Sequence, residues 1–374
     1  MRMPIMIQEN EEIELCFSLM PNVGPVTYHA LCKKFAGPRQ LYGASRSQLE
    51  LHMSPKRAAD IYLWCARWDY HFELKKLAKL AITFIGYSNP LYPSQLRSLS
   101  DAPIGLFVRG NEYVMEQLPH IRCMAIVGTR RATSYGRDVT QHLAATLSEA
   151  GWCIVSGLAA GIDAQAHSAT LERGNPTIAF LGCGVDVIYP AANSGLYRAI
   201  EREGLVMSEF APGLPPQPGL FVSRNRLVAG ISEGVIVIEA GIDSGAMVTA
   251  QIAADQGKEV FAVPGHVTSA MSHGPNRLIR DGAHVVLEPA DVLDYYGMRS
   301  GEIGQKIAIT DQAIWQKLST HEQKLVSQLM REPYSLDELV ELLGFSTSEL
   351  LGMLSLLELQ NLVKKNEQSR YYLA

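Results

Sequence analysis

Short apolar runs alternate with amphipathic segments through the middle of the chain. Each run is almost continuously apolar, as strands covered by helices on both faces are. Most runs end in a polar, glycine-containing turn and are followed by a segment of helical periodicity. This alternation predicts an α/β fold, a doubly wound, Rossmann-like parallel sheet. The runs begin at Ile121, Trp152, Pro176, Gly204, Gly234, Glu259 and Ala283.

The first part of the chain has a helical pattern and predicts a helical domain over residues 1–84. Gly24 lies between two short helices, as in a helix-hairpin-helix (SAM-like) element whose turn N–H groups hold a backbone phosphate. Lys33 and Lys34 follow on the second helix. A hairpin that only packs is the alternative, since any such hairpin uses a glycine. Residues 85–120 form a bridge, and the run at 102–110 predicts a strand that extends the sheet edge.

The C-terminal part predicts a winged-helix domain over residues 321–374, after a glycine-containing linker at 291–320. Ser335 and Ser346 each begin a capping box. The segment that follows Ser369 is predicted to pair with the segment that begins at Leu362, as a hairpin. The third helix, residues 347–360, contains glutamates and no lysine or arginine, so duplex DNA would repel it. We expect this domain to contact protein or to support a dimer, with weak DNA contact left to the lysines of the wing.

Composition restricts the class of protein. With 374 residues, 47% hydrophobic and 19% charged, the chain predicts two or three globular domains. No apolar run approaches a membrane span and the N-terminus lacks a signal-peptide core, so we expect a cytoplasmic protein. The six scattered cysteines predict buried thiols in a reducing compartment. A formal charge of −5 means that any nucleic-acid binding must be local.

Two glycine turns follow the first two central strands and predict an anion site. Each turn leads into a helix N-terminus, whose free N–H groups and positive dipole end favour a negative charge. The first offers hydroxyl and guanidinium groups and the second a hydroxyl: Gly128, Thr129, Arg130 and Arg131, then Ser156 and Gly157. The turns lack both the dinucleotide fingerprint and a Walker A lysine. Two arginines suit a phosphate chain along the surface; a plain scaffold with solvated arginines is the alternative.

A later helix carries Arg224, Asn225 and Arg226 beside a proline-rich loop at 212–218. Arginines two positions apart do not share a helix face, so we expect one to reach a ligand and the other to brace the loop. A purely structural role for both is as well supported. Glu239 ends a strand, and without a partner nucleophile we expect it to orient one of these arginines rather than act as a base.

Other chemistry is not supported by the sequence. Ser244 lies near a helix N-cap. His266 and His273 have no cysteine or carboxylate at metal-ligand spacing, so we expect no metal and no cofactor. Gly230-Ile-Ser-Glu-Gly234 fits the nucleophile-elbow pattern, but its serine follows a helix and precedes a strand, the reverse of the order in hydrolases.

The motifs together resemble the DNA-processing protein A (DprA) family over roughly residues 85–290. The resemblance rests on Ala125–Gly136, Val155–Asp163 with Ala166-His167, Arg224–Arg226 with Ala229-Gly230, Glu239, Ser244-Gly245, Thr249-Ala250, Val260–Gly265 and Gly274–Ile279. It implies a non-enzymatic protein that binds single-stranded DNA without sequence preference, protects it, and loads the RecA recombinase during natural transformation. It also implies a homodimer formed through the Rossmann-like domain.

The resemblance implies a set of DNA-binding residues. They are Gly128, Thr129, Arg130, Ser156, Gly157, Arg224 and Asn225, followed by Arg131, Arg226 and Lys258. Thr129 stands where the family often has serine, which keeps a hydroxyl. Phe221-Val-Ser-Arg224 replaces a sequence richer in proline and arginine, so one positive charge of the family pattern is in doubt.

Two other functions fit parts of the sequence. A nucleotide-binding phosphoribohydrolase-like enzyme shares the sheet and Glu239, but its P-G-G-x-G-T turn is replaced by Ala240-Gly-Ile-Asp-Ser-Gly-Ala246. A transcription regulator would use the winged helix, whose acidic third helix argues against it.

Overall fold

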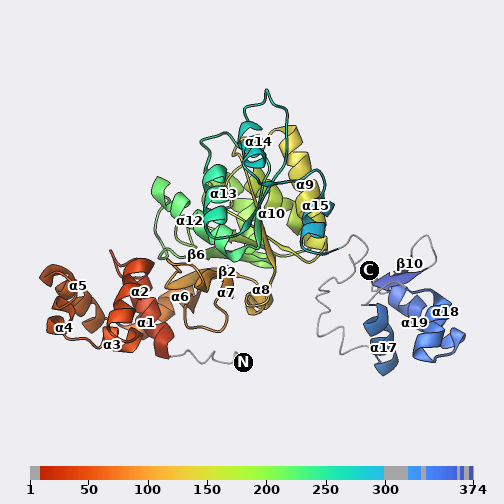
Figure 1. The fold of residues 1–374 in the computed structure, drawn as a ribbon. Helices are drawn as coiled ribbons and strands as arrows, with labels where there is room; N and C mark the ends of the chain where they lie inside the picture. The colour runs from red at the N-terminus through yellow and green to blue at the C-terminus, as the bar shows by residue number, and fades with distance from the viewer. Residues whose placement is uncertain (1–8, 299–318, 330–333, 360–362, 366–369, 374) are drawn as a thin grey trace. The chain divides into compact units, whose positions relative to one another are not determined.

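The computed structural model describes residues 9–298, 319–329, 334–359, 363–365 and 370–373. The chain divides into two compact units, one of Met1–Ser148 with Trp152–Leu287 and one of Glu149–Gly151 with Glu288–Ala374 (Figure 1). Among the described residues, no helix is long and apolar enough to span a bilayer. All six cysteines are free thiols, as the sequence predicts; four are buried, and Cys32 and Cys65 are only partly buried.

A nine-stranded sheet forms the centre of the first unit, in the order β1-β2-β6-β5-β4-β3-β7-β8-β9. The predicted α/β fold is confirmed, with one refinement: β1 and β2 are antiparallel, so the sheet is mixed. In the order of the sheet, all the strands from β6 through β5, β4, β3, β7 and β8 to β9 are parallel to one another. The bounds are Thr83–Gly86, Gly105–Gly110, Cys123–Val127, Cys153–Ser156, Thr177–Phe180, Leu205–Ser208, Gly234–Val237, Glu259–Ala262 and His284–Val285 for β1 to β9.

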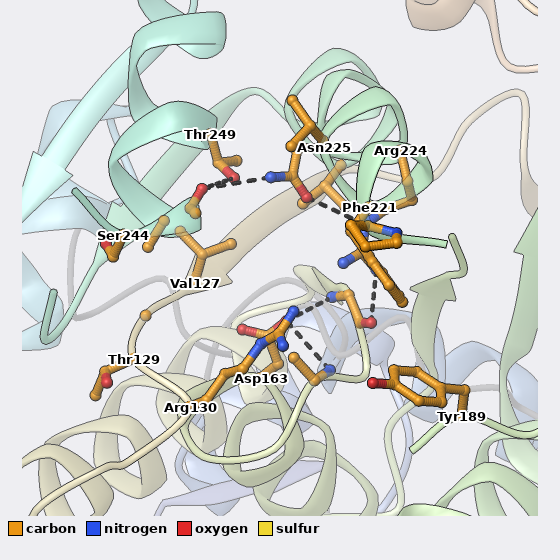
Figure 2. Close-up of a pocket in the computed structure, with 18 residues that line it drawn as sticks. Val127, Thr129, Arg130, Asp163, Tyr189, Phe221, Arg224, Asn225, Ser244 and Thr249 are labelled. Carbon is orange, nitrogen blue, oxygen red and sulfur yellow. Dashed lines mark hydrogen bonds between the residues drawn. The ribbon is translucent and has the colours of Figure 1, made fainter. Parts of the chain in front are cut away.

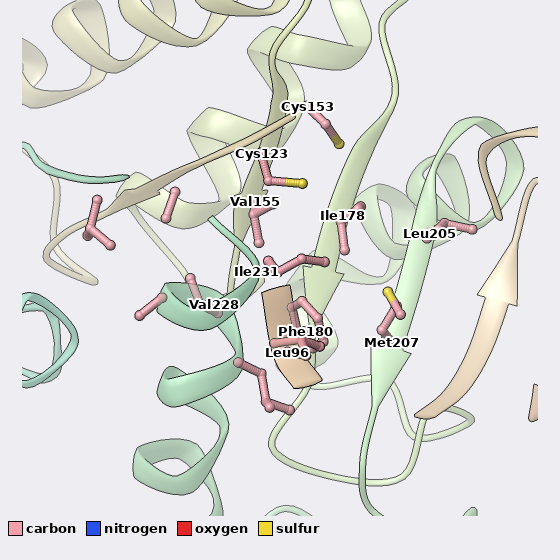
Figure 3. Close-up of a cluster of buried hydrophobic side chains, with 14 of the residues drawn as sticks. Leu96, Cys123, Cys153, Val155, Ile178, Phe180, Leu205, Met207, Val228 and Ile231 are labelled. Atoms are coloured by element: carbon pink, nitrogen blue, oxygen red, sulfur yellow. The ribbon is translucent and has the colours of Figure 1, made fainter. Parts of the chain in front are cut away.

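Helices cover both faces of this sheet. Alternation along the strands divides their side chains: Ile178 and Phe180 of β5 pack on one face, and Ala179 packs on the other. Figure 3 shows the first face, where Val228 and Ile231 of α12 and Leu96 of α7 pack on the strands. The helices after β1 are α7 Ser94–Arg97, α8 Glu112–Gln117, α9 Ser134–Glu149, α10 Ile162–Glu172, α11 Ser194–Glu203, α12 Pro218–Ile231, α13 Gly245–Asp255 and α14 His273–Arg280, with the 3-10 turn η1 Ala191–Asn193.

The N-terminal helices form the predicted helical region and are joined to the sheet by buried acids of α1. Glu11 accepts hydrogen bonds from the Gly86 amide (3.0 Å) and the Asn89 side chain (2.7 Å). Glu14 accepts from the amide and hydroxyl of Ser88, and burial raises the pKa of Glu14 to about 7. The helices are α1 Glu9–Ser18, α2 Pro25–Lys34, α3 Pro38–Tyr42, α4 Arg46–Glu50, α5 Pro55–Ala66 and α6 Tyr70–Lys79.

The second unit contains the three helices and the hairpin that the sequence predicts. Both predicted capping boxes form, since Ser335 and Ser346 exchange hydrogen bonds with Glu338 and Glu349. Arg370 of the wing pairs with Glu338, and Lys365 is exposed. The elements are α15 Pro289–Tyr295, α17 Thr320–Leu329, α18 Leu336–Leu343, α19 Thr347–Leu359, β10 Val363–Lys365 and β11 Tyr371–Leu373. Most of the predicted linker lies outside the described residues.

Candidate functional site

A cavity of about 500 Å³ opens at the carboxyl ends of the central parallel strands (Figure 2). Ligands bind at this edge in open α/β sheets. The turn after β3 forms one wall and the turn after β4 forms another. The first half of α12, the start of α13 and Tyr189 from the loop after β5 complete the lining, which includes Phe221, Arg224, Asn225 and Ser244.

The turn after β3 is held by hydrogen bonds to Glu239, and its two arginines are exposed to solvent. The Thr129 amide donates to the Glu239 carbonyl (2.6 Å), and the Thr129 hydroxyl accepts from the Arg131 amide (3.2 Å). The Glu239 carboxylate accepts from the amide and hydroxyl of Thr133, at 2.9 and 2.6 Å. Our expectation that Glu239 orients Arg224 or Arg226 was therefore wrong. It anchors the loop from which Arg130 and Arg131 project into solvent.

The turn after β4 is satisfied by the protein itself. One carboxylate oxygen of Asp163 accepts from the amides of Gly157 (3.1 Å) and Ala159 (3.4 Å). The Ser156 hydroxyl is buried and donates to the Ile126 carbonyl (2.6 Å). The amides of this turn are therefore already bound to a carboxylate of the protein, that of Asp163 in the first turn of α10. This changes the picture of two equivalent anion sites, because only the first turn presents its polar groups outward.

Arg224 lies beneath the cavity and is only 5% exposed. Its guanidinium donates to the carbonyls of Gly157 (2.6 Å) and Phe180, and its Nε donates to the Asn225 side chain (3.2 Å). A Cβ atom on Gly157 would lie 2.3 Å from this guanidinium, so a larger residue here would force Arg224 to shift. Burial lowers the pKa of Arg224. Burial also raises the pKa of Asp163, an effect that the charge of Arg224 opposes.

Two aromatic rings form the wall opposite the β3 turn. The ring of Phe221 lies 5.4 Å from the ring of Tyr189, between centroids, and the Arg130 guanidinium carbon lies 5.7 Å from the Phe221 centroid. Our sequence analysis included neither ring in the site. One signal was present: Phe221 comes three positions before Arg224, so a helix places both on one face. Nothing local links Tyr189, which follows β5, to this helix.

The predicted site residues fall into two groups. Those that line the cavity are Gly128, Thr129, Arg130, Gly157, Arg224 and Asn225. Those that do not are Arg131, Ser156, Arg226 and Lys258. Arg226 points away from Arg224 and pairs with Asp101 (3.1 Å) and with Glu209, which precedes the proline-rich loop. Lys258 precedes β8 and so lies at the amino ends of the strands. DNA contact by any of these residues stays a prediction.

Catalytic and metal sites find little support in the described part of the chain. No group of three or more histidine, cysteine or acidic side chains there could hold a metal ion. Ser232 of the elbow-like sequence is buried after α12 and donates to the Val228 carbonyl (2.8 Å), a geometry that agrees with our rejection of a hydrolase elbow.

Comparison with known proteins gives consistent matches. The family described as DNA recombination-mediator protein A matches residues 83–297, and a DprA winged-helix domain matches residues 313–366. The DNA processing protein DprA of Bacillus subtilis is 39% identical over 213 residues, covering 57% of this chain and 71% of the relative.

Two solved structures are similar to the fold. The DNA processing protein A structure from Streptococcus pneumoniae has a TM-score of 0.66 at 32% identity and covers 77% of this chain and 98% of its own. The Helicobacter pylori structure, described by its single-stranded DNA binding mode, has a TM-score of 0.52 at 31% identity. It covers 57% of this chain and 95% of its own.

Proposed function

Because the chain belongs to the DNA recombination-mediator protein A family, we propose that it binds single-stranded DNA without sequence preference. In this proposal it is a binding protein and not an enzyme. It protects incoming DNA and loads RecA recombinase on it during natural transformation in the cytoplasm.

The observation that carries the proposal is the pairing of an exposed cation with aromatic rings at one cavity. Arg130 stands in solvent over the edge of the cavity and close to Phe221, which neighbours Tyr189. Single-strand-binding proteins combine cations that follow the phosphates with rings on which any base stacks. Every base has a π-face, so this arrangement supports binding without sequence preference.

The phosphoribohydrolase alternative lacks an available catalytic acid. A catalytic carboxylate must be free to transfer a proton at the scissile bond. Asp163 is the sole carboxylate among the described residues that line the cavity, and it is held by two amides. Glu239 is committed to Thr133. These contacts favour binding over hydrolysis.

Assembly and partners are part of the proposal. The Helicobacter relative, by its description, binds single-stranded DNA, which supports the same ligand here. A homodimer through the α/β unit is supported by the sheet edge at β9, where Leu287 is 79% exposed. Val285 of β9 is exposed as well, and exposed apolar side chains are suited to contact with a second copy. RecA as partner is supported by the family's description as a recombination mediator.

Fluorescence anisotropy with labelled oligo-dT and the matching duplex, at two salt concentrations, tests the ligand. We expect tight binding to the single strand and weak binding to the duplex. If some five phosphates are neutralised, log affinity should fall with log salt at a slope of about −3.5, roughly 0.7 per phosphate. Arg130→Ala should weaken binding clearly and reduce this slope by about 0.7.

Arg198→Ala, an exposed arginine of α11, is the matched control and should bind as the wild type does. Absence of single-strand binding, or indifference to Arg130→Ala, would overturn the proposal and direct attention to nucleotide hydrolysis. For the RecA step, the protein should speed RecA filament formation on DNA coated with a single-strand-binding protein. No acceleration would limit the function to binding.

A further inference from the structure

We propose that the bound single strand leaves the cavity across the first turn of α9, where Tyr135 stacks one base and Arg131 and Arg137 contact the backbone. The inference rests on the proposed function and extends it by a second contact surface. We call this surface the α9 track, defined by Arg131, Tyr135 and Arg137.

Tyr135 is an aromatic ring fixed in an exposed position. It lies in the first turn of α9 and is 46% exposed. Its hydroxyl donates to the Pro264 carbonyl, at 2.7 Å, in the loop between β8 and α14. This bond ties one end of the ring to the neighbouring loop while the ring itself stays open to solvent. A ring already held in place loses little conformational entropy when a base stacks on it.

Two arginines accompany the ring. Arg131 and Arg137 are both exposed, and neither pairs with a carboxylate in the described part of the chain. Arg137 donates to the Ala132 carbonyl (2.7 Å), so its guanidinium folds back over the loop that carries Arg131. The Arg137 guanidinium therefore lies at the residue next to Arg131 in the chain. Two acidic groups lie nearby: Asp138, which is exposed, and Glu239, whose carboxylate accepts hydrogen bonds from Thr133.

The α9 track continues directly from the cavity. Arg130 lines the cavity, Arg131 is the next residue, and Tyr135 follows within one turn of α9. The loop that holds the Tyr135 hydroxyl carries exposed His266 and Val267. Cations interleaved with an open ring are the usual surface for a single strand, whose backbone and bases are recognised together. A tyrosine that merely staples α9 to the loop would need its hydroxyl but not an exposed ring.

The experiment measures affinity as a function of DNA length. Wild type, Tyr135→Ala, Tyr135→Phe and Arg131→Ala are titrated with oligo-dT from about 4 to 16 nucleotides, the range of known single-strand sites. We expect Tyr135→Ala to weaken binding of the long oligomers by about 5- to 160-fold, the effect of one stacked base. The shortest oligomers, which the cavity alone holds, should bind as they do to wild type.

Three comparisons make the result specific. Tyr135→Phe keeps the ring and should keep most of the affinity for long oligomers, whereas Arg131→Ala should lower the salt slope for long oligomers alone. Tyr113→Ala, an exposed tyrosine of α8, is the control and should have no effect at any length. Melting temperatures of all variants establish that each one is folded.

The outcomes separate this inference from the proposed function. If Arg130→Ala weakens all lengths while Tyr135→Ala weakens none, the proposed function stands and the α9 track is wrong. If Tyr135→Phe loses as much as Tyr135→Ala, the hydroxyl staple explains the residue and the stacking role is wrong. Equal loss at every length would also overturn the track. If the wild type binds no single strand, both proposals fall.

Discussion

The turns after β3 and β4 occupy similar places in the fold but have opposite electrostatic designs. Both are glycine turns with a hydroxyl residue, and both lead to a helix at the same edge of the sheet. In the second, Asp163 occupies the amides and Arg224 lies buried beneath Gly157. In the first, Glu239 and Thr129 accept hydrogen bonds from the loop itself, and the side chains of the arginines face solvent. One turn is built for stability, whereas the other leaves charge available to a ligand.

The largest effect on the free energy of unfolding should come from removing the carboxylate of Asp163, the internal anion of the turn after β4. Asp163→Ala leaves two amides without an acceptor and the charge of Arg224 without compensation. Leaving a buried charge without compensation typically costs about 3–5 kcal/mol. Urea unfolding should show a loss of this size, whereas Asp138→Ala, an exposed aspartate of α9, should change stability by less than about 0.5 kcal/mol. Equal stability of the two variants would contradict the internal-anion role.

A smaller loss of stability should follow from adding a side-chain atom at Gly157 in the same turn. Gly157→Ala places a Cβ 2.3 Å from the Arg224 guanidinium, and overpacking of this kind costs about 1–3 kcal/mol. Gly219→Ala is the control, because nothing lies within 4 Å of its added Cβ and alanine favours a helix more than glycine does. Thermal unfolding of the two variants should therefore shift in opposite directions. A Gly157→Ala variant as stable as wild type would show that Arg224 is free to move.

The helix that follows the closed turn should also make stability pH-dependent. His167 of α10 is buried against Thr177 (2.7 Å), and burial lowers the pKa of His167 to about 3. Below pH 6.5 the unfolded chain takes up this proton and the folded chain does not. His167 alone should therefore lower the free energy of unfolding by about 1.4 kcal/mol for each pH unit from 6.5 down to 3, while the raised pKa of Glu14 acts in the opposite sense.

His167→Gln should remove that slope from urea titrations repeated at each pH. His142→Gln, an exposed histidine on α9, should leave it in place. A wild-type slope that survives in His167→Gln would assign the pH dependence to other groups.

Local patterns predicted the fold and only part of the candidate site. Strands were predictable because each is a short apolar run, and the opposite directions of Arg224 and Arg226 follow from helix geometry. The partner of Glu239 was not predictable, because Thr133 lies 106 positions away. The same holds for the meeting of Tyr189 and Phe221, which depends on how two separate loops approach. Tertiary proximity leaves no trace in a single sequence.

The buried acids of α1 determine where this molecule can be divided. Glu11 and Glu14 reach across to the segment after β1 and supply acceptors that no residue of that segment provides for itself. A fragment that began at Thr83 would expose the apolar side chains beneath α1 and leave the amides of Gly86 and Ser88 without these acceptors. The helical region and the first edge strand therefore form one structural unit. Exchange of domains between relatives would succeed only if α1 and the segment after β1 were transferred together.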